Sequence, residues 1–197
     1  MSYEIISVFR LSDTSKLIIS TRPEQRPLYL FSEVIFTLVT QNREIILYDD
    51  FICEGLKMFT ALLKKAINGQ LVLERSLCGK DLGLICNEYY HEVDDDNYVY
   101  SEKEIIDDFI KYQLWEVKNT ITTPSNYDTN TWLYNHDNEI MLEVTPLYPH
   151  HCLETCSVET YNEFIKQYTK IEAIAITKEA PSLLQKCTAL LSTINCF

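Results

Sequence analysis

The chain has 197 residues, of which 46% are hydrophobic and 12% are aromatic, which suits one domain spanning residues 1–197, or two small domains that share a core. Its formal net charge of −12, from 17 basic and 29 acidic side chains, argues against nucleic acid or an anionic membrane as partner. No apolar run approaches the ~20 residues of a membrane span, and four glycines with six prolines exclude a low-complexity chain.

The cysteines and the N-terminus both indicate a reducing compartment. The seven cysteines are an odd number and include no Cys-x-x-Cys pair, and this pattern argues against a disulfide framework. The first ten residues lack the basic and apolar regions of a signal peptide. We therefore expect a cytoplasmic protein whose thiols are reduced.

The N-terminal part of the chain predicts strands joined by turns. Residues 4–10 and 16–20 are apolar and β-branched, and the turn-prone residues between them predict a hairpin. Residues 29–40 are ambiguous, because their apolar side chains have helical spacing but many are β-branched. We favour a helix there, since the segment is longer than ten residues and follows Pro27. Residues 44–48 then predict a strand.

The clearest helix is predicted to begin at residues 49–50. Aspartate is a good N-cap, and acidic side chains in a first turn interact favourably with the helix dipole. An apolar stripe continues from there to Ile67, and Gly69 ends the helix. Residues 71–77 and 83–86 are apolar runs that we interpret as strands.

Residues 131–145 predict a second hairpin, with two β-type runs around a turn-prone tetrad. The loop length sets what the aromatic side chains face. A loop of three or five residues places Trp132 and Tyr134 opposite Ile140 and Leu142, whereas a loop of two or four residues places them opposite the other face. We favour the first register, because it buries the large apolar side chains together.

The rest of the chain completes a mixed fold. A strand is predicted over residues 112–121, a helix over 158–168, a strand over 171–177 and a final helix over 181–194. Strands and helices alternate without βαβ regularity, and several strand pairs have short links. The sequence therefore predicts an α+β fold, with one mainly antiparallel twisted sheet and helices packed on it.

An acidic segment over residues 88–108 stands out from the rest. It holds nine acidic side chains and one lysine, with tyrosines among them. Carboxylates pair bidentately with arginine, and tyrosine is enriched in binding hot spots, so we predict a surface for a basic partner. A solvated acidic loop is the alternative interpretation. The predicted partner-binding residues are Glu88, Tyr89, Tyr90, Glu92, Asp94, Asp95, Asp96, Tyr98 and Tyr100.

The densest group of possible metal ligands or nucleophiles is His150, His151, Cys152 and Cys156. Its spacing is looser than that of zinc motifs, and neighbours in sequence rarely form a Cys–His pair with catalytic geometry. The sequence has no Walker A, GxSxG or HExxH motif. We predict no catalytic residue, metal or cofactor, and keep a thiol- or metal-dependent enzyme as the alternative.

Residues of this hairpin and of the helix predicted after it also resemble a known protein family. Trp132-x-Tyr134-Asn135, then Glu143-Val144-Thr145-Pro146-x-Tyr148, then a helix with Tyr161-x-x-Phe164 resemble the C-terminal half of immunity proteins from bacterial polymorphic toxin systems, including contact-dependent growth inhibition. The resemblance implies a small cytosolic α+β protein without catalysis, small-molecule substrate, nucleic-acid partner or membrane partner. It would bind a cognate toxin C-terminal domain and block it by occlusion. A generic acidic adaptor is a further alternative.

The resemblance bears on charge as well as fold. It implies that the toxin is often a nuclease with a basic active site, to which a chain of net charge −12 is complementary. The matched residues look structural, so no toxin-binding residue is carried over from them. The predicted interface therefore depends on the acidic segment alone.

Overall fold

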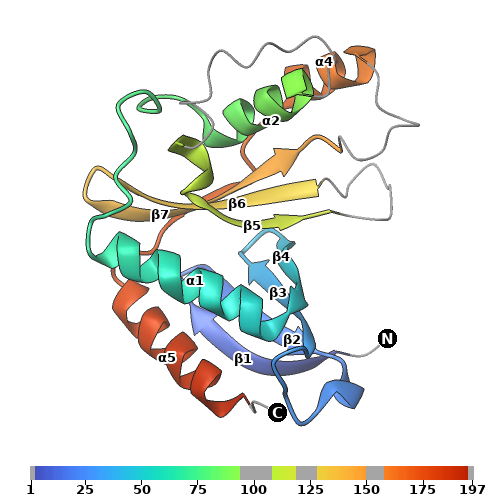
Figure 1. Cartoon of the computed structure of the whole chain (residues 1–197), viewed down its shortest axis with the longest axis vertical. Helices are drawn as coiled ribbons and strands as arrows, with labels where there is room; N and C mark the ends of the chain where they lie inside the picture. Colours follow the sequence, from blue (N-terminus) through green and yellow to red (C-terminus); the bar gives the residue numbers. More distant parts are fainter. Residues whose placement is uncertain (1–2, 94–107, 119–127, 150–157, 195–197) are drawn as a thin grey trace.

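The computed structural model describes residues 3–93, 108–118, 128–149 and 158–194. Within these ranges the chain forms two four-stranded antiparallel sheets, with strand orders β1-β2-β3-β4 and β5-β6-β7-β8, together with packed helices (Figure 1). The α+β class and the antiparallel pairing are confirmed. The strands are divided between two sheets, whereas the sequence predicted one.

Two groups of elements make up the fold. The first half consists of β1 (Glu4–Arg10), β2 (Lys16–Thr21), β3 (Glu33–Val39), β4 (Glu44–Phe51), α1 (Ile52–Ile67) and α5 (Ala180–Thr193), with a short 3-10 helix at Pro23–Gln25. The second half consists of α2 (Leu82–Val93), β5 (Gln113–Val117), β6 (Asp128–His136), β7 (Glu139–Leu147), α4 (Val158–Gln167) and β8 (Glu172–Ala175).

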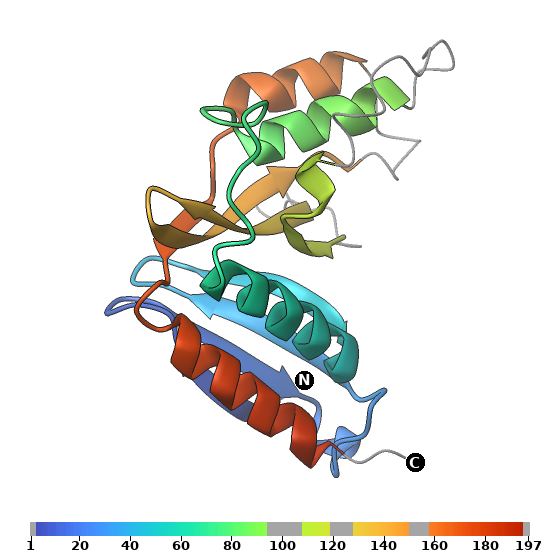
Figure 2. The same ribbon diagram turned by 60° about the vertical axis from the view of Figure 1, so that its left-hand side comes forward.

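The first sheet alternates buried and open positions, as the β-branched runs predict. Phe9, Leu17, Ile19, Phe36 and Leu38 are buried on one face of the sheet. Helices α1 and α5 lie side by side over that face (Figure 2). The predicted hairpin of β1 and β2 is confirmed, and so are the predicted elements at β4, β5, β8, α4 and α5, with shifted ends.

Four predictions for the middle of the chain are wrong. Residues 29–40 contain strand β3 instead of a helix, because their β-branched side chains pair with β2 on one side and β4 on the other. Residues 71–77 form no strand, only turns and an isolated β-bridge of Val72 with Asn135, and residues 83–86 belong to helix α2. A short apolar run does not distinguish a strand from a buried helix turn. Helix α1 begins at Ile52, since Asp49 and Asp50 extend β4.

The hairpin of β6 and β7 closes through a two-residue loop. Asp137 and Asn138 have φ angles of 48° and 65°, the left-handed conformation of a type I′ turn. Trp132 therefore lies opposite Glu143, and Tyr134 opposite Met141, so the predicted register is wrong. The prediction assumed one covered face. In the structure both faces are covered, and Trp132 and its neighbour Leu133 are equally buried.

The two halves share one hydrophobic core. Trp115 on β5 packs between Phe36, Tyr48 and Phe59 of the first half, with ring centroids 5.1 to 5.8 Å away. Asn135 on β6 contacts the C-terminal end of α1: its Nδ2 donates to the Ala66 carbonyl at 3.0 Å. These contacts fix the second sheet against α1 and β4, and a single cluster of buried residues includes both halves.

Candidate functional site

The predicted acidic surface falls only partly within the described residues. Glu88, Tyr89 and Tyr90 lie on α2, and Glu88 is exposed. Glu92 also belongs to α2, but its side chain lies outside the described part. The remaining predicted residues lie outside the described ranges: Asp94, Asp95, Asp96, Tyr98 and Tyr100.

Tyr89 and Tyr90 also support the fold. Both are half-buried and pack against the core. The Tyr89 ring lies 5.4 Å from that of Tyr90 and 5.8 Å from that of Phe109. Burial, together with the nearby Cys86 and Glu116, raises the pKa of Tyr90 to about 12. Each tyrosine therefore offers only part of its ring to a partner.

Helices α2 and α4 form a layer on the side of the second sheet away from α1 (Figure 2). The His91 ring of α2 stacks on Tyr161 of α4, with centroids 3.6 Å apart. Tyr161 in turn packs edge-on against Tyr148, which follows β7, at 5.2 Å. Phe164 of α4 lies 5.4 Å from the same Tyr148 ring. Aromatic contacts thus join the two helices to the end of β7.

Helix α2 is fixed to β7 by buried polar contacts. Asn87 is fully buried, and its Nδ2 donates to the carbonyls of Gly83 at 2.7 Å and Pro146 at 2.9 Å. The Asn87 Oδ1 accepts from the Tyr148 amide at 2.6 Å. At Gly83 the helix approaches β7 so closely that an added Cβ would lie 2.3 Å from Thr145 Oγ1. The helix therefore presents its outer side chains from a rigid base.

A charge cluster centred on the buried Glu143 lies beneath this layer. Glu143 is buried on β7, and its Oε2 accepts from Tyr134 Oη and from Lys170 Nζ, each at 2.8 Å. Asp81 lies 3.6 Å from the same ammonium, and its Oδ1 accepts from Tyr168 Oη at 2.6 Å. Asp81 Oδ1 also accepts from the Leu84 amide, in the first turn of α2. The cluster thus joins α2, β6, β7 and the segment before β8.

The surroundings of this cluster raise the pKa of Tyr134, Tyr168 and Lys170. Burial raises the pKa of Tyr134 and Tyr168, and the carboxylates of Glu143 and Asp81 raise both further. Burial lowers the pKa of Lys170, but Glu143 and Asp81 outweigh it, so the net shift is upward. The tyrosines stay neutral and the lysine stays charged near pH 7. The Glu143 Oε1 atom has no hydrogen-bond partner among the described residues.

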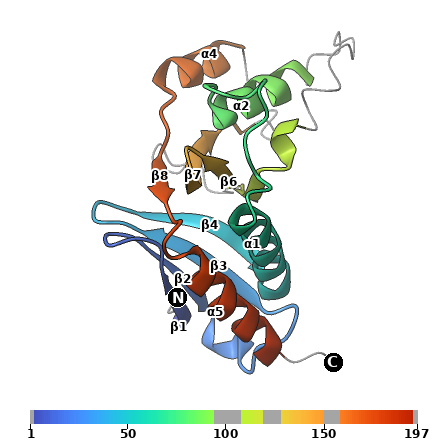
Figure 3. The same ribbon diagram turned by 90° about the vertical axis from the view of Figure 1, so that its left-hand side faces the viewer.

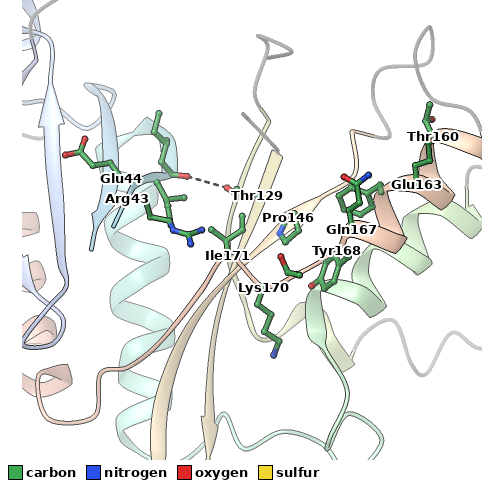
Figure 4. Close-up of a pocket in the computed structure, with 14 residues that line it drawn as sticks. Arg43, Glu44, Thr129, Pro146, Thr160, Glu163, Gln167, Tyr168, Lys170 and Ile171 are labelled. Carbon is green, nitrogen blue, oxygen red and sulfur yellow. Dashed lines mark hydrogen bonds between the residues drawn. The ribbon is translucent and has the colours of Figure 1, made fainter. Parts of the chain in front are cut away.

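A cavity of about 730 Å³ opens between the two halves, within the usual size of a ligand pocket. Figure 4 shows Arg43 reaching toward Ile171, while Lys170 extends away from Arg43. Among the described residues Arg43 has no carboxylate partner. The lining residues are Arg43, Glu44, Ile45, Ile46, Thr129, Pro146, Thr160, Glu163, Phe164, Gln167, Tyr168, Thr169, Lys170 and Ile171. This mixed lining can hold a polar side chain or a short peptide segment.

The predicted alternative site, formed by His150, His151, Cys152 and Cys156, lies outside the described residues. Within the described ranges, no group of three or more His, Cys, Asp or Glu side chains converges as metal ligands would. Cys53, Cys78, Cys86 and Cys187 are free thiols. Burial raises the pKa of Cys86 and of Cys187 to about 12, which makes both weak nucleophiles near neutral pH.

The sequence analysis missed the charge cluster and the cavity. Asp81, Glu143 and Lys170 are far apart in sequence, and only the fold brings them together. One signal was present: a glutamate in the middle of the apolar run of β7 predicts a paired buried charge.

None of the helices in the described ranges has the length and apolar character that crossing a bilayer requires.

Comparison with known proteins gives no relative for this arrangement. A scan against family models, a search of curated proteins and a search of solved structures each found no match. The function is therefore inferred from the chain's own residues.

Proposed function

We propose that this protein is a cytoplasmic immunity protein, which binds a basic cognate toxin domain in a stoichiometric complex and neutralises it by occlusion. The observation that carries the proposal is the uneven distribution of charge. Residues 82–177 contain 18 acidic and five basic side chains, whereas residues 1–81 contain ten of each. The whole excess of negative charge therefore belongs to the segment that builds the second half.

The elements of the second half suit a recognition role. Glu88 on α2 and Glu163 on α4 are exposed, and both helices are fixed to the sheet through buried contacts. Side chains on rigid elements lose less conformational entropy on binding than side chains on loops. An acidic surface on such a base attracts a basic partner over several ångströms and increases the association rate, most strongly at low ionic strength.

The direct test is complex formation with the polypeptide encoded by the neighbouring upstream gene. We expect the two chains to co-purify in a one-to-one complex with nanomolar or tighter affinity, and this protein to abolish the toxicity of that polypeptide in cells. Calorimetry gives the stoichiometry, and a growth assay gives the neutralisation. Failure to bind, or protection at far below one equivalent, would contradict stoichiometric occlusion.

A charge variant tests the surface. Asp94→Asn, Asp95→Asn and Asp96→Asn together remove three negative charges from the predicted interface. We expect association to slow about tenfold at low salt, with a smaller salt dependence, because the charges steer encounter. The matched control removes three exposed charges from the first half: Asp13→Asn, Glu24→Gln and Glu54→Gln. Equal effects of the two triples would show that only total charge matters and would reject the interface.

A further inference from the structure

The first sheet has an open face, which no helix among the described residues covers. Helices α1 and α5 lie on one side of the sheet, and the opposite side is bare in Figure 3. Side chains on this face are apolar at many positions: Ile5, Val8 and Ile46 are 56%, 48% and 39% exposed. Ile18, Ile35 and Val39 lie between them and are half-buried.

Strand register places these side chains in rows that cross all four strands. One row is Val8, Ile18, Thr37 and Ile46. The row beside it is Arg10, Lys16, Val39 and Glu44. The β1–β2 side of this second row is thus basic, while its β4 end is acidic.

The rest of the face continues this polarity. Arg22 follows β2 on the basic side, while Glu33 on β3 and Asp49 on β4 lie on the acidic side. Positive charges on this face therefore lie towards β1 and β2, and negative charges lie towards β3 and β4. The uncharged row of Val8, Ile18, Thr37 and Ile46 separates the row of Glu44 from the row of Asp49. Such a face is complementary to itself when a second copy is turned over, with its β4 above the first copy's β1.

We propose that this face is the interface of a homodimer, in which two first sheets pack face to face about a two-fold axis parallel to the strands. The axis places Arg10 opposite Glu44 of the second copy and Val8 opposite its Ile46. Nearly aligned packing of two sheets is a common geometry. A two-fold axis across the strands would instead place Glu44 opposite Asp49, two like charges.

Charge and sheet edges both favour this face over others. The ten acidic and ten basic side chains of residues 1–81 cancel, so two first halves meet without net repulsion, unlike two second halves. The β1 edge carries a bulge between Ile5 and Ser7, which disfavours edge pairing. At the β4 edge the Ile46 carbonyl accepts from Thr129 Oγ1 at 3.4 Å, so the second half occupies it.

The size of the face sets the expected affinity. Four strands spaced about 4.8 Å apart, with about seven residues rising 3.3 Å each, give a projected area of roughly 440 Å². A standard interface buries about 800 Å² per partner, so we expect a dimer of micromolar affinity. The proposed toxin complex uses other elements, α2 and α4, although Glu163 of α4 borders the same cavity as Glu44 and Ile46. The dimer is measured without any toxin, so its test does not depend on the proposed function.

Sedimentation velocity of the full chain across about 1 to 500 μM tests the dimer. We expect the wild type to shift from monomer to dimer, and Val8→Asp to raise the dissociation constant at least about tenfold, since the carboxylate meets Ile46. The matched control is Val72→Asp, at a valine 63% exposed in the loop before α2, which should leave the dissociation constant unchanged. Equal constants for the two variants, or a wild type monomeric throughout, would overturn the proposal.

A second variant tests the direction of the axis without touching the apolar centre. Glu44→Lys should weaken the dimer severalfold, because the new lysine meets Arg10 of the other copy. Under the alternative axis it would meet Asp49 and strengthen the dimer. Tightening by Glu44→Lys would therefore overturn the proposed geometry. Glu44 is exposed, so its replacement leaves the fold intact, which circular dichroism checks.

Discussion

The two halves of this molecule are held together in different ways. In the first half, β-branched and aromatic side chains alternate along four strands and pack under α1 and α5, with nearly every buried position apolar. In the second half, polar groups such as Asn87, Thr145 and Glu143 are buried, and each makes at least one specific hydrogen bond. The first half therefore depends on area removed from water, while the second depends on specific hydrogen bonds.

That difference has a consequence for function. A dry core tolerates many apolar substitutions, but a buried polar cluster fixes the position of every element it joins. The acidic second half is the part for which we propose binding, and it is also the part whose helices are positioned by directional contacts. The comparison predicts different responses to mutation on the two sides.

The largest effect is expected at the junction of the halves. Trp115→Ala should lower the free energy of unfolding by about 4 kcal/mol, because it removes the ring that packs on Phe36, Tyr48 and Phe59. Urea denaturation measures it, with Trp132 fluorescence reporting the second half and circular dichroism the whole chain. Trp115→Phe should cost much less. If the halves are as coupled as their shared core indicates, both probes will follow one transition.

The next effect isolates the charge cluster. Lys170→Met leaves the buried Glu143 carboxylate without its cation and should cost about 2–3 kcal/mol at pH 7, below the full cost of a buried pair since Lys170 is partly exposed. Adding Glu143→Gln should recover part of this loss. Lys111→Met, which breaks the exposed pair with Glu74, should cost less than about 1 kcal/mol. Equal costs at the two lysines would contradict a special role for buried charge in the second half.

The smallest effect depends on pH. Tyr168 has a raised pKa, owing to burial and then to Asp81, so its folded state favours the neutral phenol. This contribution is present below the ordinary tyrosine pKa of about 10 and is lost as pH rises above it. Tyr168→Phe should therefore cost about 1 kcal/mol at pH 7, through its lost hydrogen bond to Asp81, and less at pH 11. Denaturation at both pH values measures the difference, and a constant cost would show that ionisation of Tyr168 does not matter.

Sequence reasoning succeeded where one local signal dominated. The alternation in β1 and β2, and the apolar stripes of α1, α4 and α5, each predicted the correct element type. It failed at β3 and at residues 83–86, where apolar spacing fits both helix and strand. The register of β6 and β7 was missed because the sequence does not state that both faces of that hairpin are covered.

The sequence by itself determined the α+β class, the antiparallel pairing and the concentration of negative charge, since these depend on local pattern and composition. Only the tertiary structure decided which strands share a sheet, and that Asp81 and Lys170 meet at the buried Glu143. Such contacts join residues far apart in the chain, where the free energy gained depends on the surroundings of each group instead of on its neighbours in sequence.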